Sequence, residues 1–483
     1  MEKYYQNYQS LEGGQLKPLH RQRWLRAVMG LILLGMGIYS LFRNFSGTMR
    51  IQPASRPTSL DNFEKCSIDN FRGTGYPFLD PAIPMTVEDF EDRRDRLALA
   101  LVADGVDAFV VEPGYTFKYY ANISQPEWEV WEPEERPFLL VVQPERLPSG
   151  KVKSKSSFLC PSFEAERARL LGMPFTEAID IIPWEEHWDP YETLRTAETF
   201  SRLRRTPRLM VDEEMRDFIQ RGLGRAGFHV VGLQGEVERV RQIKSEKEIG
   251  ILRAVNTGTV EAVRQMRKCL SPGLTESEIA RVLDKTLLSA GLEPFFDIVL
   301  FDENAANPHG GTNGSKVLEA ETFVLIDVGA HLMGYSSDIC RTFFPPFLER
   351  PASDAAVPDW MREKLDVWDI VFEAQTKSID RFIVNATAAS VDIAARAVIS
   401  AAGYGDAFTH RVGHGIGIKA HESPYLNKGN HETVLRAGMT FTSEPGVYLV
   451  DKFGVRHEDI LLVRENDTAE LLTGQRAIGP WDP

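Results

Sequence analysis

Cysteine, net positive charge and long apolar runs are all scarce in this chain of 483 residues. The four cysteines are scattered and show no Cys-x-x-Cys spacing, so the sequence predicts neither a zinc knuckle nor a disulfide framework. Basic residues number 55 against 69 acidic ones, and a net charge of −14 argues against nucleic-acid binding, which needs a positive field. With 43% hydrophobic and 26% charged residues, the composition is that of a folded chain. The length predicts two large domains or about three ordinary ones.

The one long uncharged apolar run occupies residues 27–42 (AVMGLILLGMGIYSLF). As a helix it would measure roughly 24 Å, shorter than a hydrocarbon core of about 30 Å, and the flanking Trp24, Arg26 and Arg43 can close that gap by snorkelling. A signal peptide or a buried core helix would be the alternatives. A long polar region precedes the run and no small-x-small cleavage site follows it, so we predict an uncleaved transmembrane signal anchor.

The charges beside this run predict its orientation. Basic residues are slightly more frequent before it than after it, which makes residues 1–26 a cytoplasmic tail and places the body in the lumen or outside the cell. Asn-x-Ser/Thr sequons at Asn44, Asn122, Asn385 and Asn466 are compatible with this placement, although the pattern is frequent by chance. We therefore expect a single-pass membrane glycoprotein of the secretory pathway.

Residues 43–85 are rich in Ser, Pro, Thr and Asn and lack sustained periodicity, which predicts a stalk or linker. In residues 86–240, helical patterns alternate with short apolar strands. The clearest examples are an amphipathic helix at 87–104 and a buried strand at 108–111. This alternation predicts an α/β domain.

A second domain is predicted at residues 245–475. Ser245 with Glu248 forms a capping-box pattern at the start of an apolar helical stripe, and Thr275 with Glu278 repeats the pattern for a second helix. After these helices strands, turns and polar residues predominate, and the residues capable of chemistry are concentrated there.

The second domain contains the stretch 323–344 (FVLIDVGAHLMGYSSDICRTFF), in which Asp327 and Asp338 stand eleven residues apart. Turn residues, including Met333-Gly334, separate two β-rich runs, so the stretch predicts a hairpin. If the strands pair, the carboxylates can point into one space, where they would repel unless a cation or a shared proton lay between them. Taken alone, the hairpin favours a simpler interpretation, two aspartates at a solvent-facing turn.

Three further donors follow. The segment 409–425 (THRVGHGIGIKAHESPY) concentrates three of the chain's ten histidines. Glu444 ends an apolar strand before Pro-Gly, and Glu458 begins another apolar strand. The combined set has one histidine and four carboxylates: Asp327, Asp338, His414, Glu444 and Glu458.

This set of donors fits two divalent cations. Oxygen-rich ligation favours manganese, with cobalt, iron or zinc as alternatives. Two such ions can lower the pKa of a water and polarise a carbonyl oxygen, which predicts a hydrolase.

These residues, in the phrases LIDVGA, GYSSDICRTF, GHGIG, HESPY, SEPGVY and VRHEDILLV, resemble the pita-bread metallopeptidases, specifically the Xaa-Pro aminopeptidases and Xaa-Pro dipeptidases (prolidases). The resemblance covers about residues 86–475. It implies a creatinase-like α/β N-terminal domain, a pita-bread α+β catalytic domain, two manganese ions and proline-containing peptides as substrates. We also expect a homodimer.

The resemblance implies a place for each metal ligand. Asp338 and Glu458 would bridge the two ions. Asp327 would complete one site, and His414 with Glu444 would complete the other.

It also implies catalytic residues around the metals. His309, in NAANPHG, matches a histidine that assists substrate binding or proton transfer, and His421 matches one that stabilises the tetrahedral intermediate. His410 and Arg456 match positions that shape the substrate pocket and support the two glutamates. Because Asn313 follows His309 in this cleft-forming stretch, we expect its sequon to stay unused.

Two features depart from the family pattern. Cys340 stands where relatives commonly have threonine, on the strand face that Asp338 also occupies. It is either a near-isosteric replacement or, if exposed, a source of sensitivity to oxidation. The second departure is the membrane anchor.

The sequence is compatible with several functions. The short interval between Glu444 and Glu458 leaves little inserted structure, which weakly favours an aminopeptidase over a dipeptidase. A non-peptidase enzyme of the same fold, such as a creatinase or a lyase acting on a small zwitterion, is a second class. A non-catalytic binding module is a third. The complete set of metal ligands argues against both.

Overall fold

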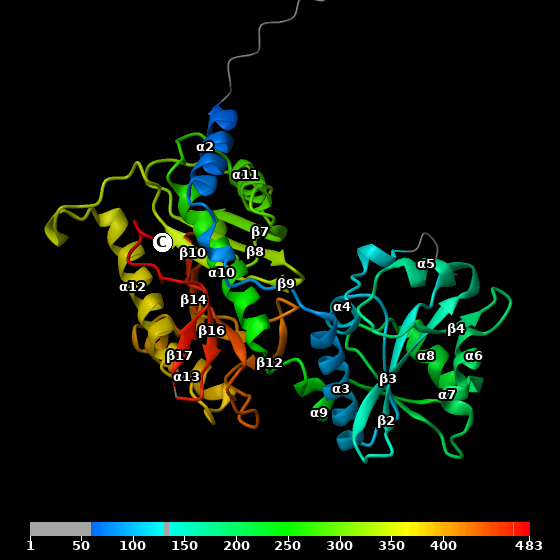
Figure 1. Cartoon of the computed structure of the whole chain (residues 1–483). Helices are drawn as coiled ribbons and strands as arrows, with labels where there is room; N and C mark the ends of the chain where they lie inside the picture. The colour runs from blue at the N-terminus through cyan, green and yellow to red at the C-terminus, as the bar shows by residue number, and fades with distance from the viewer. Residues whose placement is uncertain (1–58, 130–134, 467) are drawn as a thin grey trace, which may run out of the picture. The chain divides into compact units, whose positions relative to one another are not determined.

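A computed structural model describes residues 59–129, 135–466 and 468–483 (Figure 1). Its N-terminal α/β region is built on a mixed six-stranded sheet. The strand order is β4-β3-β2-β1-β5-β6. At its centre β1 (Ala108–Val111) is fully buried, pairing antiparallel with β2 and parallel with β5. The other strands are β2 (Leu139–Arg146), β3 (Val152–Pro161), β4 (Asp180–Trp184), β5 (Arg208–Val211) and β6 (His229–Gly232).

Helix α3 (Val87–Asp104) confirms the first predicted helix. The side chain of Thr86 accepts a hydrogen bond from the backbone N–H of Asp89, and the Asp89 carboxylate accepts one from the backbone N–H of Thr86, forming a capping box. Gly105 ends the helix in the left-handed region, at φ 63°. The remaining helices of this region are α4 (Tyr115–Ala121), α5 (Ala165–Leu170), α6 (Pro190–Thr196), α7 (Glu198–Ser201), α8 (Asp217–Arg225) and α9 (Gly235–Arg239).

Four longer helices accompany the strands of the second region. Both predicted capping boxes are present, Ser245 with Glu248 and Thr275 with Glu278. Each satisfies backbone donors that would otherwise lack partners at a helix start. These helices are α10 (Glu246–Arg267), α11 (Glu276–Leu288), α12 (Asp359–Ile379) and α13 (Ala388–Ala401).

Two antiparallel sheets carry the chemistry. One has the order β10-β8-β7 and the other β12-β11-β13-β16-β17. The backbone N–H of Glu458 donates to the carbonyl of Cys340 at 3.1 Å and joins the two sheets. The strands are β7 (Glu293–Phe301), β8 (Val324–Leu332), β9 (Tyr335–Ser336), β10 (Ile339–Phe343), β11 (Gly413–Gly415), β12 (Glu422–Leu426), β13 (Thr440–Ser443), β14 (Gly446–Leu449), β15 (Phe453–Arg456), β16 (Asp459–Val463) and β17 (Ala469–Leu471).

Helix α2 (Ser59–Gly73) corrects the sequence prediction over part of the expected stalk, residues 43–85. Its Phe63 and Phe71 are buried in the core that α10 and α11 also form, because they lie on one face of the helix. A disulfide joins Cys66 on this helix to Cys269 beyond the end of α10. The expectation that the cysteines form no disulfide framework was therefore wrong for one pair, whose members stand 203 residues apart in sequence.

No helix within residues 59–129, 135–466 and 468–483 is long and apolar enough to cross a membrane. The predicted cytoplasmic tail and the signal anchor at 27–42 lie outside the described residues, as does the sequon at Asn44.

Candidate metal centre

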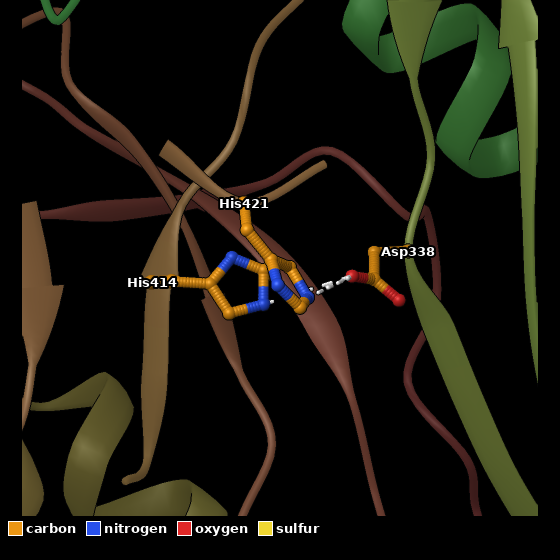
Figure 2. Close-up of side chains that lie close together, drawn as sticks. All are labelled: Asp338, His414 and His421. Atoms are coloured by element: carbon orange, nitrogen blue, oxygen red, sulfur yellow. Dashed lines mark ion pairs between the residues drawn. The ribbon is translucent and has the colours of Figure 1, made fainter. Parts of the chain in front are cut away.

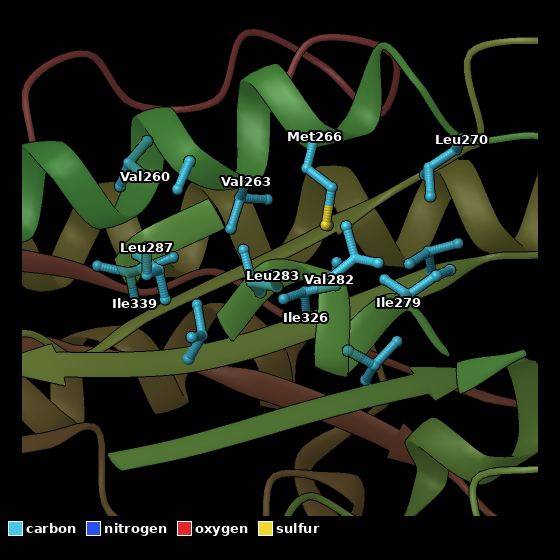
Figure 3. Packing of buried hydrophobic residues seen from close by; sticks show 14 of the residues in the cluster. Val260, Val263, Met266, Leu270, Ile279, Val282, Leu283, Leu287, Ile326 and Ile339 are labelled. Atoms are coloured by element: carbon cyan, nitrogen blue, oxygen red, sulfur yellow. The ribbon is translucent and has the colours of Figure 1, made fainter. Parts of the chain in front are cut away.

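The predicted hairpin is present, and it separates the two aspartates from the apolar core. Strands β8 and β10 pair antiparallel, with Asp327 opposite Cys340. Neighbouring side chains alternate between the two faces of a strand, so Ile326 and Ile339 point into the core beneath α10 and α11, as Figure 3 shows. The carboxylates of Asp327 and Asp338 are thereby directed to the opposite face.

Strands from the second sheet bring the other donors to these carboxylates. The Nε2 atom of His414, on β11, lies 3.2 Å from Glu444 Oε1 and 3.6 Å from Asp338 Oδ2. The Nε2 atom of His421 lies 3.8 Å from the same Asp338 oxygen. Figure 2 shows the two imidazoles beside each other, facing Asp338.

Among the residues that the structure describes, three overlapping groups offer ligand atoms within 4.8 Å of one another. Together the groups contain all five predicted ligands and His421. Asp338, His414 and Glu458 each belong to two groups, so the three groups share their donors. The groups are Asp327, Asp338 and Glu458; His414, Glu444 and Glu458; and Asp338, His414 and His421.

The site is rich in buried negative charge. Burial and the neighbouring carboxylates raise the pKa of Asp338 and of Glu458 well above the ordinary range. Burial also raises the pKa of Asp327, although the adjacent Arg456 opposes this shift. In Glu444, by contrast, the hydrogen bond and charge of His414 outweigh burial and lower the pKa. Such a cluster is stabilised by bound cations or by protons.

Two further observations fit a metal. The Oδ1 atom of Asp327 is buried and has no hydrogen-bond partner among the residues that the structure describes, so it is available as a ligand. The Nδ1 atom of His414 lies 3.1 Å from the carbonyl of Gly415, which orients the ring with Nε2 toward the carboxylates. The donor set therefore fits divalent cations.

A hydrogen-bonded network supports the centre from behind. Arg456 is 2% exposed and its Nη2 donates to Asp327 Oδ2. Its Nη1 donates to the Tyr448 hydroxyl at 2.8 Å, and that hydroxyl lies 2.7 Å from Nε2 of His410. Sequence reasoning missed Tyr448. The pattern SEPGVY placed it near Glu444, but only the pairing of β14 with β15 sets it between the histidine and the arginine.

His309 lies at the edge of this arrangement. Its side chain is exposed, and the carbonyl of the preceding Pro308 accepts a hydrogen bond from Arg456 Nη2 at 3.1 Å. The structure therefore brings together the five proposed ligands, His421 and Arg456, connects His410 through Tyr448, and holds His309 beside Arg456.

Cys340 is fully buried, among Leu300, Ala305 and Leu325. Burial raises the pKa of its thiol well above the usual range, so the thiol stays protonated. A buried, protonated thiol reacts slowly with oxidants. The structure thus supports near-isosteric replacement rather than sensitivity to oxidation.

Buried carboxylates and histidine on an α+β scaffold define a metal-dependent hydrolase, and comparison with known proteins gives its family. The sequence pattern of metallopeptidase family M24 matches residues 250–465. An uncharacterised peptidase of Schizosaccharomyces pombe is 38% identical over 434 residues, which cover 89% of this chain and 90% of the relative. The chain belongs to metallopeptidase family M24.

Solved structures agree with this assignment. A prolidase from Thermococcus sibiricus is 27% identical, with a TM-score of 0.65, over 80% of this chain and 98% of that one. An X-Pro aminopeptidase from Thermotoga maritima is 26% identical, with a TM-score of 0.61, over 79% and 97%. The predicted pita-bread fold is confirmed.

Proposed function

We propose that this metallopeptidase hydrolyses the bond before proline in peptides, using two divalent ions held by Asp327, Asp338, His414, Glu444 and Glu458. The observation that carries the proposal is the overlap of the three donor groups through Asp338, His414 and Glu458. The names of the similar prolidase and X-Pro aminopeptidase support the substrate class. Manganese is the ion that the oxygen-rich donors favour.

When bound, the ions would lower the pKa of a water and polarise the scissile carbonyl. The protein's own groups prepare the site for this chemistry. Arg456 offsets the charge of Asp327 and is itself held by Tyr448. Partial burial and the neighbouring His414 lower the pKa of His421 to about 4, so its imidazole is neutral at pH 7. A neutral imidazole still has one N–H to donate to a developing oxyanion, the role that the family resemblance gives to His421.

The bond before proline suits such a site. It is a tertiary amide without an N–H, and the preceding residue is conformationally restricted. A peptidase that recognises its substrate through the N–H of the scissile bond finds no donor there. Polarisation of the carbonyl by metal ions does not need this N–H. The resemblance places the pyrrolidine ring beside His309 and His410.

The aminopeptidase remains our preferred specificity. Strands β14 and β15 form a two-stranded hairpin between Glu444 and Glu458, with three residues, 450–452, between the strands. This compact connection supports the weak preference drawn from the sequence. A creatinase-like or lyase activity and a purely binding role are less favoured, because all five donors come together.

We also propose that the catalytic body lies in the lumen or outside the cell, tethered by the predicted anchor at residues 27–42. The Cys66–Cys269 disulfide supports this location, because disulfides persist in oxidising compartments. Three sequon asparagines, Asn122, Asn385 and Asn466, are exposed. Glycosidase treatment should increase the electrophoretic mobility of the protein. If the body lies in the lumen, external protease should digest it only after the membrane has been opened. A body facing the cytosol without glycans would contradict the proposal. The homodimer stays a prediction.

Manganese-loaded protein, tested on Gly-Pro and on a longer X-Pro-X peptide, tests the activity. We expect cleavage of the longer peptide at its first bond and its loss in Asp338→Ala. Asp359→Ala, at a fully exposed position, is the matched control and should retain activity. Preference for Gly-Pro would identify a dipeptidase. Cleavage of neither substrate, or an active Asp338→Ala variant, would refute the Xaa-Pro peptidase.

A further inference from the structure

The position of His421 depends on the backbone that carries it. Its side chain is 56% exposed, and its ring centroid lies 4.1 Å from that of His414. Among the hydrogen bonds between described residues, none involves the His421 imidazole. The segment 417–424, which we call the His421 segment, must therefore be held by other contacts.

A buried ion pair lies under this segment. Lys244 and Glu422 have side chains only 2% and 4% exposed, and Lys244 Nζ donates to Glu422 Oε1. The same ammonium donates to the carbonyl of Arg241 at 2.7 Å. Glu422 is the direct neighbour of His421 in the chain. Lys244 belongs to the segment between the two regions, where its backbone N–H donates to the carbonyl of Gly438 at 2.9 Å.

Gly417 allows the segment to pass close to this pair. A Cβ atom at residue 417 would lie 2.6 Å from Glu422 Oε1 and 2.8 Å from Lys244 Cε, so a side chain there would displace the ion pair. The carbonyl of Gly417 accepts from the backbone N–H of Ser336 at 2.9 Å. Ser336 lies just before Asp338, so the segment is tied to the aspartate that His421 faces.

The N-terminal region adds a second set of contacts. Lys419 Nζ donates to Glu213 at 2.7 Å and lies 2.8 Å from Glu214 Oε1. Gln242 Nε2 donates to Ser423 Oγ at 3.0 Å. The His421 segment is therefore held by the N-terminal region and by the connection between the two regions, through residues that are not among the proposed metal ligands.

We propose that Lys244 and Glu422 are positioning residues for His421, and that through them the interdomain connection sets the geometry of the active site. The buried pair fixes the start of β12, which follows His421 directly, and contacts the bend at residues 417–421 that precedes it. A charge pair of this kind is well suited to the task, because loss of either partner leaves the other charge buried and forces the segment to move. The inference rests on the proposed function, which gives His421 its role.

Glu422→Gln and Lys244→Met test the proposal in the full-length enzyme. We expect each to lower kcat about 10- to 100-fold, because small displacements of catalytic groups are costly, with KM little changed. Lys244→Arg, which keeps the charge, should retain most of kcat. Lys452→Met is the matched control. It breaks an exposed pair with Glu363 and should leave kcat unchanged.

A double-mutant cycle separates positioning from general damage. In a His421→Ala background, Glu422→Gln should cause little additional loss of kcat, because the group that it positions is already absent. Hydrogen exchange measured by mass spectrometry should show faster exchange across residues 417–424 in Glu422→Gln. Full additivity with His421→Ala, or an unchanged kcat in Glu422→Gln, would overturn the proposal.

The hydrogen-exchange measurement also distinguishes a failure of the positioning role from a failure of the proposed function. If the wild-type enzyme cleaves no Xaa-Pro peptide, the proposed function fails. Unchanged exchange across residues 417–424 in both Glu422→Gln and Lys244→Met would refute the positioning role whatever the activity.

Discussion

Replacing Arg341 by methionine tests how the two sheets are held together around the metal centre. Arg341 is 1% exposed, and its Nη2 donates to Asp459 Oδ1 at 2.7 Å. Its Nη1 donates to the carbonyls of Cys340 at 3.0 Å and of Glu458 at 2.6 Å. These contacts hold β10 of one sheet against the start of β16 in the other. The proposed ligands Asp338 and Glu458 lie next to this junction.

The expected cost follows from burial. Without Arg341, Asp459 keeps hydrogen bonds from Gln375 at 2.9 Å and Thr473 at 2.7 Å but loses its cation. Removing one partner of a buried ion pair typically costs about 3–5 kcal/mol. In a domain of roughly 200 residues, each kcal/mol lowers Tm by about 2–4 °C, so we expect a fall on the order of 10 °C.

Thermal unfolding followed by circular dichroism measures this effect. Lys452→Met again serves as the control, since an exposed ion pair contributes about 1 kcal/mol or less. Replacing both Arg341 and Asp459 by apolar residues should recover part of the loss, because no buried charge is then left unpaired. If Arg341→Met lowers Tm no more than the control does, the pair does not stabilise the junction and the reasoning is wrong.

Three further predictions concern other parts of the molecule. Partial burial and the neighbouring Asp297 raise the pKa of Asp284 to about 6, so the stability that its protonated form contributes is present below about pH 4 and lost as pH rises through 6. Asp284→Asn should therefore raise Tm near pH 7 but not near pH 3, and equal shifts at both would contradict this. Replacing Cys66 and Cys269 by serine should lower the free energy of unfolding by up to about 5 kcal/mol in urea titrations, because their disulfide closes a loop of 203 residues; an unchanged midpoint would refute a stabilising disulfide. Chelation should lower Tm, since metal at 100 times its Kd stabilises the folded state by about 2.7 kcal/mol, and a Tm insensitive to both chelator and manganese would argue against a metal centre.

Local sequence patterns predicted the helices and the hairpin because these elements depend on neighbouring residues. The helix at 87–104 and the strand at 108–111 have the predicted bounds, and each predicted capping box is present. Asp327 and Asp338 alone did not predict a metal site. They did so only together with the donors that the second sheet supplies. Residue types, their order and the family resemblance identified that set in the sequence.

Long-range partners were not predictable in the same way. The pairing of Cys66 with Cys269 depends on α2 packing against α10 and α11, and the residues around Cys66 gave no sign of that partner. Likewise, Lys244 precedes a helix cap and Glu422 follows a histidine, but nothing in the sequence around either residue predicts that the two form an ion pair. Such contacts require the folded arrangement of distant segments.

The metal content of the purified, manganese-loaded protein tests the dinuclear site most directly. After gel filtration, elemental analysis of the wild-type protein should find about two ions per chain. Asp338→Ala should bind fewer than one, because this carboxylate belongs to two of the three donor groups. Two ions retained in Asp338→Ala, or none bound by the wild type, would contradict a centre built on Asp338.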